Sequence, residues 1–418
     1  MPANQPVLTG PEARSIVAER GFGGPTTTKP PGGADRVGVE LEWLAVCAKD
    51  RARPAPLEAI QAITANLGPL PGASRVTFEP GGQLELSSAA LPGSQASDAL
   101  DRDLAVLAPA LADVGVGLVA MGLVPGSPRP RVVRSPRYDA MEAFFDADGD
   151  AGRLMMASTA ALQINVDFGT GDDVANRWRL AHDVGPVLAA AFANSPLVDG
   201  RPSGWRSARL AIWSALDQGR STAVTTSGPP REAWAEYALA ARVMFVRCSD
   251  TCHVPLTETL SFADWIDRGH HLGWPTSEDL EYHLTTLFPP VRPRGWLELR
   301  MIDALPTPWW RVAVGVAVAL VTEPDIASSV RAAVEPVRDR WAVAARYGLA
   351  HPDLARAART CFDAAAAVMA PDATHEATDA FVDRYVARGR CPADDTLAAW
   401  ARDGCVVPNL EAGDARWS

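Results

Sequence analysis

The sequence predicts an α+β protein built on a largely antiparallel β-sheet with helices packed on one side. Segments in which apolar and polar residues alternate recur from the N-terminal region to about position 300, and this period of two is typical of strands in a half-buried sheet. Helical segments stand between the strands without the regular spacing of βαβ units, which argues against a parallel sheet. From Pro308 onward the chain is rich in alanine and predicts helices.

Each element follows from its own pattern. Alternation of apolar and polar residues predicts strands at 37–44, at two positions within 75–88 joined by a Gly-Gly turn, and at 115–124, 160–168 and 295–302. Segments of helical composition, bounded by glycine and proline, predict helices at 56–67, 96–112, 138–156 with an interruption near 148–152, 171–194, 231–247 and 277–287. The helical region after Pro308 has expected breaks near 371 and 391, and a loop rich in proline and arginine covers 125–137.

Composition excludes several classes of protein. The 418 residues are enough for a large core, and 47% hydrophobic with 21% charged residues is a globular composition. A net charge of −11 lacks the basic footprint of a nucleic-acid binder. The apolar stretch 104–124 contains Pro109 and Asp113, and the stretch 312–321 is shorter than the roughly 20 residues that span a bilayer. Without a recognisable signal peptide, we expect a soluble cytoplasmic protein that does not enter a membrane.

Four predicted strands carry the same chemistry on their polar faces. Because side chains alternate along a strand, each of these sets shares one face: Glu40 and Glu42; Gln83, Glu85 and Ser87, with Glu79 just before the turn; Gln163, Asn165 and Asp167; Trp296, Glu298 and Arg300. Any one strand could simply turn its polar face to water. All four together fit that reading poorly, since the faces hold five glutamates, amides and a single arginine. Carboxylates that converge raise each other's pKa unless cations neutralise them.

The residue types on these faces indicate a magnesium or manganese site. All of the candidate ligands are oxygen donors, which suit Mg²⁺ or Mn²⁺ better than zinc. Mg²⁺ held by carboxylates usually completes its coordination with water and substrate phosphates. The sequence has neither a P-loop nor a dinucleotide fingerprint, so a nucleotide phosphate site of another kind is indicated. Arg300, beside Glu298, could stabilise charge on a transferring phosphoryl group.

The motifs resemble those of a known family, the plant-type glutamate–cysteine ligases within the glutamine-synthetase-like carboxylate–amine ligases. The matching segments span 37–307 in the family's order: GVELEW, FEPGGQLELS, PRYDAM, LMMAST, LQINVDF, ALAAAFANSPLVDG, SARLAIW and WLELRMIDALP. The branch most similar to this chain is the actinobacterial one that supplies γ-glutamylcysteine for ergothioneine synthesis. The region after 307 matches only as a helical tail.

The resemblance implies a fold and roles for individual residues. It implies a curved, mostly antiparallel sheet that forms a funnel, with helices around it. Residues 36–418 would form one catalytic domain, with a sheet-based core at 36–307 and a helical region at 308–418, after a flexible N-terminal arm at 1–35. The residues that resemble metal ligands for two or three Mg²⁺ ions are Glu40, Glu42, Glu79, Glu85, Glu298 and Gln163. Those expected to contact substrate or phosphate are Arg300, Arg209, Arg137, Tyr138, Asn165 and, from its place near Arg209, Trp213.

The implied reaction is ATP-dependent. ATP would phosphorylate the γ-carboxylate of L-glutamate, and the amine of L-cysteine would then displace phosphate to give γ-glutamylcysteine. No enzyme nucleophile is needed, and the sequence has no Ser–His–Asp or Cys–His signature. Two alternatives remain open: a related ligase that uses a different amine, and a non-catalytic relative that binds glutamate or nucleotide. The oligomeric state is open as well.

Two further groups of residues have no assigned role. Cys248, Cys252 and His253 lack the second pair of ligands that a zinc site would need, which leaves a structural role or a redox pair. His270 and His271 lie in a loop-like stretch, where a place on the surface or along a substrate channel is favoured over metal binding.

Overall fold

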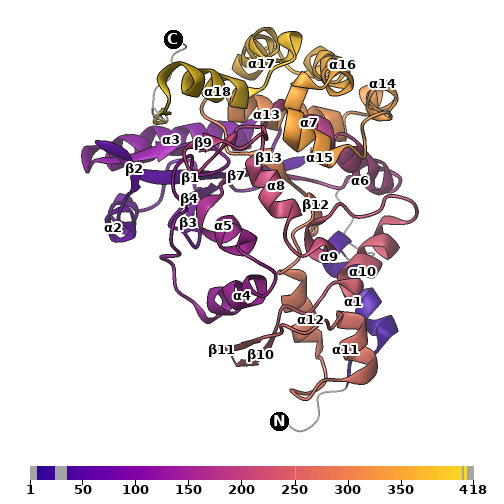
Figure 1. Cartoon of the computed structure of the whole chain (residues 1–418). Coiled ribbons are helices and arrows are strands. Elements are labelled where there is room, and N and C mark those ends of the chain that lie inside the picture. The colour runs from indigo at the N-terminus through magenta and orange to yellow at the C-terminus, as the bar shows by residue number, and fades with distance from the viewer. Residues whose placement is uncertain (1–6, 24–34, 250, 407–408, 412–418) are drawn as a thin grey trace.

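One branched antiparallel sheet organises the molecule (Figure 1). In the computed structural model, the described residues are 7–23, 35–249, 251–406 and 409–411. The main path of the sheet runs in the order β12 (Val291–Pro293), β13 (Leu297–Asp303), β7 (Ala161–Val166), β1 (Arg36–Cys47), β4 (Leu84–Ser87) and β3 (Arg75–Phe78). Three more strands pair with β1, namely β2 (Asp50–Pro54), β5 (Leu91–Pro92) and β6 (Val116–Val119). Neighbouring strands are antiparallel, which confirms the predicted α+β class.

The long central strand β1 sets the geometry of the sheet. Its residues 37–41 pair with β7, residues 40–43 pair with β4 on the other edge, and the last four residues pair with β6. Val39, Leu41 and Trp43 are buried on one face of β1, as the alternation predicts. Glu40 and Glu42 therefore point to the other face, toward a different layer of the molecule.

Helices surround the sheet and alternate with it along the chain, so the expectation from element order that they pack on one side only was wrong. Those before the last strand are α1 (Gly10–Phe22), α2 (Leu57–Leu67), α3 (Gln95–Asp113), α4 (Pro136–Asp146), α5 (Ala151–Ser158), α6 (Asp173–Asp183), α7 (Gly185–Ala191), α8 (Ala208–Ser214), α9 (Gln218–Ser221), α10 (Pro230–Ala240), α11 (Phe262–Arg268) and α12 (Ser277–Leu284). Those after it are α13 (Trp309–Thr322), α14 (Pro324–Val334), α15 (Trp341–Tyr347), α16 (Pro352–Val368), α17 (Ala373–Arg384) and α18 (Pro392–Asp403), with short 3₁₀ turns η1 (Gly348–Ala350) and η2 (Val386–Arg388). Two small hairpins complete the described structure, β8 (Leu197–Val198) with β9 (Arg201–Pro202) and β10 (Phe245–Ser249) with β11 (Cys252–Pro255).

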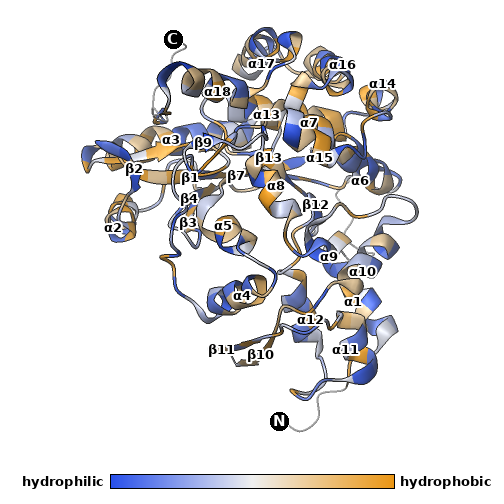
Figure 2. Ribbon diagram, viewed as in Figure 1, coloured by the Kyte–Doolittle hydropathy of each residue, from blue (hydrophilic) through white to orange (hydrophobic). Residues whose placement is uncertain are grey.

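The apolar face of the sheet forms the main core. Helices α3, α6, α7 and α13 contact its strands, and the core joins residues as distant as Leu41 and Leu320. The outer helices carry both hydrophobic and hydrophilic residues, which is typical of helices that pack one face on a core (Figure 2). Because the core takes residues from both 36–307 and 308–418, it supports the predicted single domain, which stays a prediction.

The polar face of the sheet meets a second layer. Helices α4 and α5 form a smaller apolar cluster with Met244 and Phe245, and the carboxylate-bearing strands lie between this layer and the main core. The Gly-Gly turn before β4 packs directly on the end of α5. A Cβ on Gly81 would lie 2.0 Å from the carbonyl oxygen of Ala157, and Gly82 has a φ of 79°. Both turn positions therefore require glycine.

Two predicted helices differ from the structure. The predicted helix 171–194 is divided into α6 and α7 at Val184 and Gly185. The prediction of helix over 231–247 was wrong at its end, because α10 stops at Ala240 and Phe245 begins a strand. The backbone there pairs with a later segment instead: the amide of Val243 donates to Leu260, and the amide of Leu256 donates to Met244. Such long-range pairing outweighs local helical propensity.

The N-terminal segment also differs from the predicted flexible arm. Residues 10–22 form α1, which starts at a capping box between Thr9 and Glu12 and buries Ala13 and Val17 against α10 and α12. The Thr-x-x-Glu signal was present in the sequence. Residues 1–6 and 24–34, which include most of the glycine- and proline-rich stretch at 21–33 that predicted the flexible arm, lie outside the described residues.

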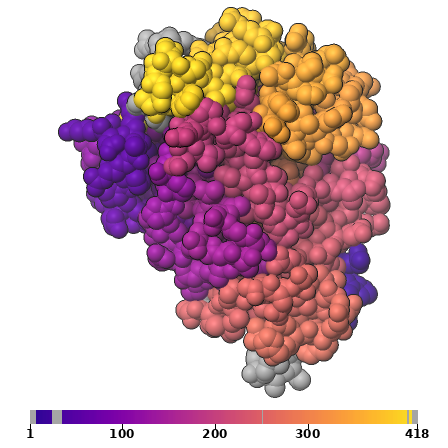
Figure 3. All heavy atoms as spheres, viewed as in Figure 1, coloured from indigo at the N-terminus to yellow at the C-terminus, as the bar shows by residue number. Residues whose placement is uncertain are grey.

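The helices after β13 gather at one end of the molecule, opposite the end that holds α11, β10 and β11 (Figures 1 and 3). Within the described ranges, no single helix is long and apolar enough to cross a membrane. The pair α13 and α14, bent by 99°, meets that criterion only by length and composition.

Candidate active site

The register of the sheet brings the predicted carboxylates together. Glu42 of β1 lies opposite Glu85 of β4, and Glu40 lies opposite Gln163 of β7. One strand further, Glu298 of β13 lies opposite Asn165 of β7. Directly opposed residues in an antiparallel sheet have Cβ atoms about 4.5–5.5 Å apart, so these side chains form one continuous acidic face.

Glu79 joins this face from the turn before β4. The amide of Glu79 donates to the carbonyl of Gln83, and the amide of Gly82 donates to the carbonyl of Glu79, which closes the turn. The Gln83 side chain does not point to the carboxylates. It donates to the carbonyl of Thr159 at 2.8 Å and accepts from the amide of Gly81, and so fastens the turn to the segment after α5.

Neutral donors orient Glu40, Glu42 and Glu85. Gln163 Nε2 donates to Glu42 Oε1 at 3.0 Å, and Asn165 Nδ2 donates to Glu40 Oε1 at 3.0 Å. The hydroxyls of Thr77 and Ser87 both donate to Glu85 Oε1, at 2.6 and 2.9 Å. The two predicted amides thus hold glutamates in place, whatever else they contact.

The electrostatics of the face call for cations. Burial, followed by the charges of Glu79 and Glu85, raises the pKa of Glu42 to about 8. Burial and Glu85 raise the pKa of Glu79 to about 7, and burial together with Glu298 raises the pKa of Glu40. Without a cation the face would hold protons at neutral pH. A set of oxygen ligands whose negative charges repel one another suits a hard divalent cation.

Glu298 differs from the other four glutamates. It is fully buried, and Arg292 of β12 binds both of its carboxylate oxygens through Nε and Nη2. Arg300 Nη1 lies 3.3 Å from Glu298 Oε2 and Arg294 Nη1 lies 3.4 Å from Oε1. Although burial opposes it, Arg292 and then Arg300 hold the pKa of Glu298 at about 2. This carboxylate is already neutralised by arginines, so its predicted role as a metal ligand stays a prediction.

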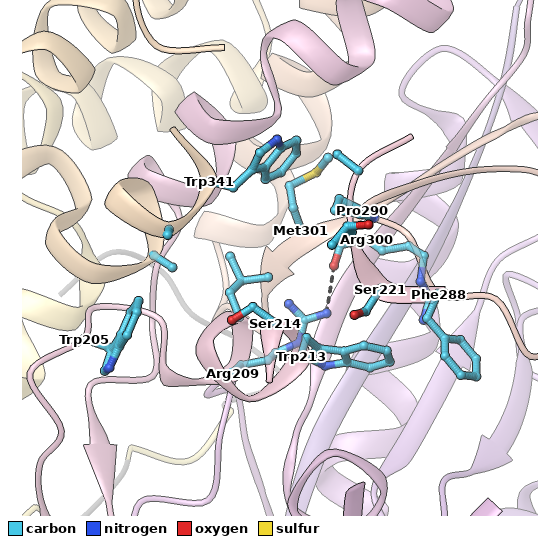
Figure 4. Close-up of a pocket in the computed structure, with 15 residues that line it drawn as sticks. Trp205, Arg209, Trp213, Ser214, Ser221, Phe288, Pro290, Arg300, Met301 and Trp341 are labelled. Atoms are coloured by element: carbon cyan, nitrogen blue, oxygen red, sulfur yellow. Dashed lines mark hydrogen bonds between the residues drawn. The ribbon is translucent and has the colours of Figure 1, made fainter. Parts of the chain in front are cut away.

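Arg300 joins the acidic face to a cavity. Its Nη1 donates to Gln163 Oε1, and its guanidinium carbon lies 5.8 Å from the centre of the Trp213 ring. The cavity has a volume of about 200 Å³ and is lined by residues of α8, α15, β13 and their loops, among them Trp205, Arg209, Trp213, Phe288, Met301 and Trp341 (Figure 4).

Arg209 is built into the wall of this cavity. Its side chain is 3% exposed, Nη2 donates to the carbonyl of Arg300 at 2.7 Å, and Nη1 lies 3.5 Å from Asp303 Oδ1 (Figure 4). Among the described residues, neither Arg209 Nη1 nor the indole nitrogen of Trp213 has a hydrogen-bond partner, although both atoms are buried. Buried donors in this state are costly, and a ligand in the cavity could satisfy them.

Arg137 and Tyr138 lie elsewhere, at the start of α4. Arg137 donates to the hydroxyl and carbonyl of Thr285 at 2.9 and 3.0 Å and stacks over the ring of Tyr282. Burial and then Glu79 raise the pKa of Tyr138 to about 12. These two predicted substrate residues therefore border the Glu79 edge of the acidic face and do not line the cavity of Arg209 and Trp213.

Two residues that organise the site were missed. Arg292 pairs with Glu298 across the hairpin of β12 and β13, and the Arg-Pro-Arg-Gly-Trp turn before Glu298 was the available signal. Asp303 is buried and accepts from the amide of Asn194 and the hydroxyls of Ser195 and Ser207 while facing Arg209. No local pattern connects these residues, so only the fold could bring them together.

The residues without an assigned role form two other clusters. Glu258, His270 and His271 bring potential ligand atoms within 4.8 Å of one another. Both ring nitrogens of His270 already have partners, Glu258 Oε1 at 2.6 Å and the amide of Leu272 at 3.3 Å. Cys248 and Cys252 are exposed on the β10–β11 hairpin, and a hydrogen bond between the two thiols is the largest cause of the raised pKa of Cys248.

Comparison with known sequences identifies close relatives. The profile of "Glutamate-cysteine ligase family 2 (GCS2)" matches residues 36–412. The chain is 43% identical over 367 residues to the "Glutamate--cysteine ligase EgtA" of Mycolicibacterium smegmatis, covering 86% of each chain. It is 44% identical over 368 residues to the EgtA of Mycobacterium tuberculosis, covering 86% of this chain and 85% of that one. A chloroplastic glutamate–cysteine ligase of Brassica juncea is 31% identical over 62% of this chain and 52% of its own length.

A solved structure supports the fold independently. The glutamate–cysteine ligase of Francisella tularensis, crystallised in complex with AMP, superposes with a TM-score of 0.52 over 88% of this chain and 85% of its own. Its sequence identity is 13%, so the likeness concerns the fold alone.

Proposed function

This chain belongs to glutamate–cysteine ligase family 2, and from that premise we propose that it joins the γ-carboxylate of L-glutamate to the amine of L-cysteine with ATP as co-substrate. The products would be γ-glutamylcysteine, ADP and phosphate. The observation that carries the proposal is the buried acidic face that meets Arg300 at the edge of a cavity lined by Arg209. Similarity to EgtA also supports a role in making ergothioneine or another small thiol.

The reaction needs two displacements. A γ-carboxylate oxygen of glutamate attacks the terminal phosphorus of ATP, the bond from that phosphorus to the bridging oxygen breaks, and ADP leaves. The amine of cysteine then attacks the acyl carbon, phosphate leaves with the bonding electrons, and the ammonium proton passes to base. Catalysis rests on positioning and on stabilising charge, as in phosphoryl transfer generally.

Arg300 is the residue best placed to act on the transferred group. It lies between the acidic face and the cavity, and Glu298 and Gln163 fix its orientation. A fixed cation costs no reorganisation when negative charge develops on the phosphoryl oxygens. Arg292 and Glu298 would act as positioning groups, since Arg292 binds Glu298 and Glu298 contacts Arg300.

Mg²⁺ is the cation that fits the acidic face, with Mn²⁺ as the alternative. Glu40, Glu42, Glu79, Glu85 and Gln163 would hold two or three ions there. Bound metal would offset the charge of the ATP phosphates and of the developing acyl phosphate. The raised pKa values of Glu40, Glu42 and Glu79 support this assignment, since each carboxylate lacks enough positive charge.

The cavity would hold an amino-acid substrate. Arg209 Nη1, which has no hydrogen-bond partner among the described residues, is a suitable donor to a substrate α-carboxylate, and Trp213 can donate from its indole nitrogen. Arg137 and Tyr138, at the Glu79 edge, would then border the acceptor amine.

The first experiment measures ADP release with Mg-ATP and glutamate, with and without a panel of amino-acid acceptors, and identifies the product by mass spectrometry. We expect cysteine to stimulate ADP release and γ-glutamylcysteine to form. Stimulation by another amine alone would keep the mechanism and replace the acceptor. Nucleotide binding without ADP release under any of these conditions would overturn the ligase proposal in favour of a non-catalytic relative.

A further inference from the structure

The loop 125–134 contains a buried arginine, Arg129, whose positive charge is not compensated by any neighbouring group that the structure describes. Arg129 is 9% exposed, and within the part of the chain that the structure describes its guanidinium has no hydrogen-bond or ion-pair partner. The other buried arginines each face a carboxylate: Arg177 with Asp35, Arg209 with Asp303, Arg220 with Asp217 and Arg292 with Glu298. A buried charge without a partner costs stability and is retained in proteins chiefly where something binds to it.

Arg129 borders a cavity that is rich in positive charge. The cavity has a volume of about 270 Å³, and four of its eight lining residues are arginines, against one acidic residue, Glu142. Arg131 and Arg153 bind Glu142 and neighbouring aspartates, whereas Arg134 is exposed on the rim. Such a concentration of cations is unexpected in a chain of net charge −11.

The loop that carries Arg129 is held in place on both sides. The amide of Arg129 donates to Ser158 Oγ at 2.9 Å, at the end of α5. The amides of Val132 and Val133 both donate to the carbonyl of Pro80, at 2.8 and 3.0 Å. Prolines at 128 and 130 further restrict the backbone. The arginine is therefore positioned before any ligand arrives, which lowers the entropic cost of binding.

This cavity is separate from the acidic face. It lies against Met156 and Ala157 of α5, and the Gly81 turn packs on that same helix. None of the glutamates of that face lines this cavity, and neither does Arg300.

We propose that Arg129 marks a second anion site that binds a phosphate group. The planar guanidinium matches the tetrahedral edge of a phosphate with two parallel hydrogen bonds. The volume lies just under the roughly 300–1,000 Å³ of pockets for drug-sized ligands, so the site suits a small anion or one end of a larger molecule.

Two sources could supply the phosphate. Arg129 also lines a second cavity of about 540 Å³, whose walls include the apolar residues Leu44, Val46, Val119 and Val124. Its other walls include the charged residues Lys49, Asp50 and Arg51, and a larger compartment with apolar and polar walls beside a cationic one suits a nucleotide. Free phosphate, a product of the proposed reaction, would need only the cationic compartment. The shared chemistry is the phosphate oxyanion.

The test is thermal unfolding of the full chain in inorganic phosphate against chloride at equal ionic strength. We expect phosphate to raise the midpoint of the wild-type protein, since a ligand that binds only the folded state stabilises it. Arg129→Met should lose most of that shift, and without phosphate it should unfold at the same or a higher temperature, because an unpaired buried charge has been removed. Arg14→Met, on the exposed side of α1, is the control and should keep the full shift.

Other results would overturn the proposal. These are an absence of any phosphate-specific shift in the wild-type protein, or the same shift in Arg129→Met. If Arg129→Met fails to fold, Arg134→Gln, at the exposed rim, should retain the fold and weaken the shift, and an undiminished shift there would count against the site.

Kinetics then assign the source. If the site takes a nucleotide phosphate, inorganic phosphate competes with ATP and the KM for ATP rises several-fold in Arg129→Met. If it takes free phosphate, that KM is unchanged and phosphate and ATP stabilise additively. Glu42→Gln, which the proposed function predicts to be inactive, should keep the phosphate shift. The phosphate site can therefore be confirmed or refuted independently of the ligase proposal.

Discussion

At the scale of single residues, the site depends on charges that are costly in isolation. Glu42 has a pKa raised to about 8 because it is buried beside Glu79 and Glu85, while Glu298 has a pKa of about 2 because it is buried beside Arg292. Two glutamates of one sheet face thus differ widely in proton affinity. The difference in pKa arises from the neighbouring side chains. Glu42 lies mainly among other carboxylates, whereas Glu298 is paired with arginines.

Replacing Glu42 by glutamine should reduce turnover by more than about 100-fold, since the loss of even an outer partner of a metal site costs roughly 10–100-fold. The fold should persist, and in the absence of Mg²⁺ at pH 8 the variant should be as stable as the wild-type protein or more so, because a neutral amide replaces a strained carboxylate. Steady-state kinetics and thermal unfolding check both. Glu236→Gln, exposed on α10, is the control, and wild-type activity in Glu42→Gln would refute the metal assignment.

Arg300→Ala should lower kcat by about 10²–10³-fold, the usual effect of losing a donor to developing charge. The KM for glutamate should change much less, since Arg300 is expected to act on the phosphoryl group. Steady-state kinetics over glutamate and ATP distinguish the two, with Arg388→Ala, an exposed residue at the end of η2, as the control. A large rise in the KM for glutamate with little change in kcat would move Arg300 to substrate recognition.

At the scale of elements, short turns and hairpins carry the site. The hairpin of β12 and β13 places Arg292 opposite Glu298, and the Gly81–Gly82 turn lets Glu79 approach α5 and the acidic face together. In both cases a few residues with special backbone or pairing requirements determine where a functional carboxylate lies.

Arg292→Leu should destabilise the protein by about 3 kcal/mol, because it leaves a fully buried carboxylate without its bidentate partner. In the wild-type protein the depressed pKa of Glu298 contributes stability that is present above the unfolded-state pKa near 4.5 and is lost as pH falls toward about 2. The variant should lack that acid-sensitive contribution. Urea unfolding at neutral and acidic pH measures both effects, and Arg338→Leu, which breaks the exposed pair with Glu335, should change stability by less than about 0.5 kcal/mol.

Gly81→Ala tests the turn. A methyl group there would overlap the carbonyl of Ala157, so the turn must shift away from α5 at a cost of about 1–3 kcal/mol. Activity should fall as well, since Glu79 moves with the turn. Gly10→Ala, where no atom lies within 4 Å of the added methyl, is the matched control for unfolding and activity measurements. Equal stability and activity in the two variants would contradict this account of the turn.

At the scale of the whole molecule, the acidic face lies between two apolar layers. The main core lies beneath the sheet, and the smaller cluster of α4 and α5 lies above it. Burial between these layers raises the pKa values of Glu40, Glu42 and Glu79, and would link the proposed metal binding to the stability of the entire fold.

The stabilisation by Mg²⁺ should therefore depend on pH. In the metal-free protein Glu42 and Glu79 have pKa values raised to about 8 and about 7, so their contribution to stability is full below the unfolded-state value near 4.5 and is lost as pH rises through those values. The proposed Mg²⁺ would bind the ionised face and would have to displace protons at low pH. Mg²⁺ should raise the unfolding midpoint more at pH 8.5 than at pH 5.5, as measured by scanning fluorimetry. An equal or larger shift at pH 5.5 would contradict the pKa assignment, and Glu42→Gln should flatten the dependence.

The sequence by itself determined which residues share a face. The alternation of strands β1, β4, β7 and β13 is a local property with a period of two, so Glu40 and Glu42, Glu85, Gln163 and Glu298 could be assigned to polar faces without a structure. Motif resemblance then connected those faces to a family, which the sequence comparison confirmed. Most helices were predicted as well, because the effects of proline, glycine and alanine on where a helix forms and ends are local.

Only the tertiary structure decided how those faces combine. The register that sets Glu42 against Glu85, the arginines that neutralise Glu298, and the separation of Arg137 from Arg209 all arise from contacts between residues distant in the chain. The end of α10 was mispredicted for the same reason, since pairing with a distant segment outweighed local propensity. The burial of Arg129 without a partner among the described residues is likewise invisible in the sequence, because both are properties of packing. Periodicity is encoded locally, whereas proximity, burial and pKa depend on the complete fold.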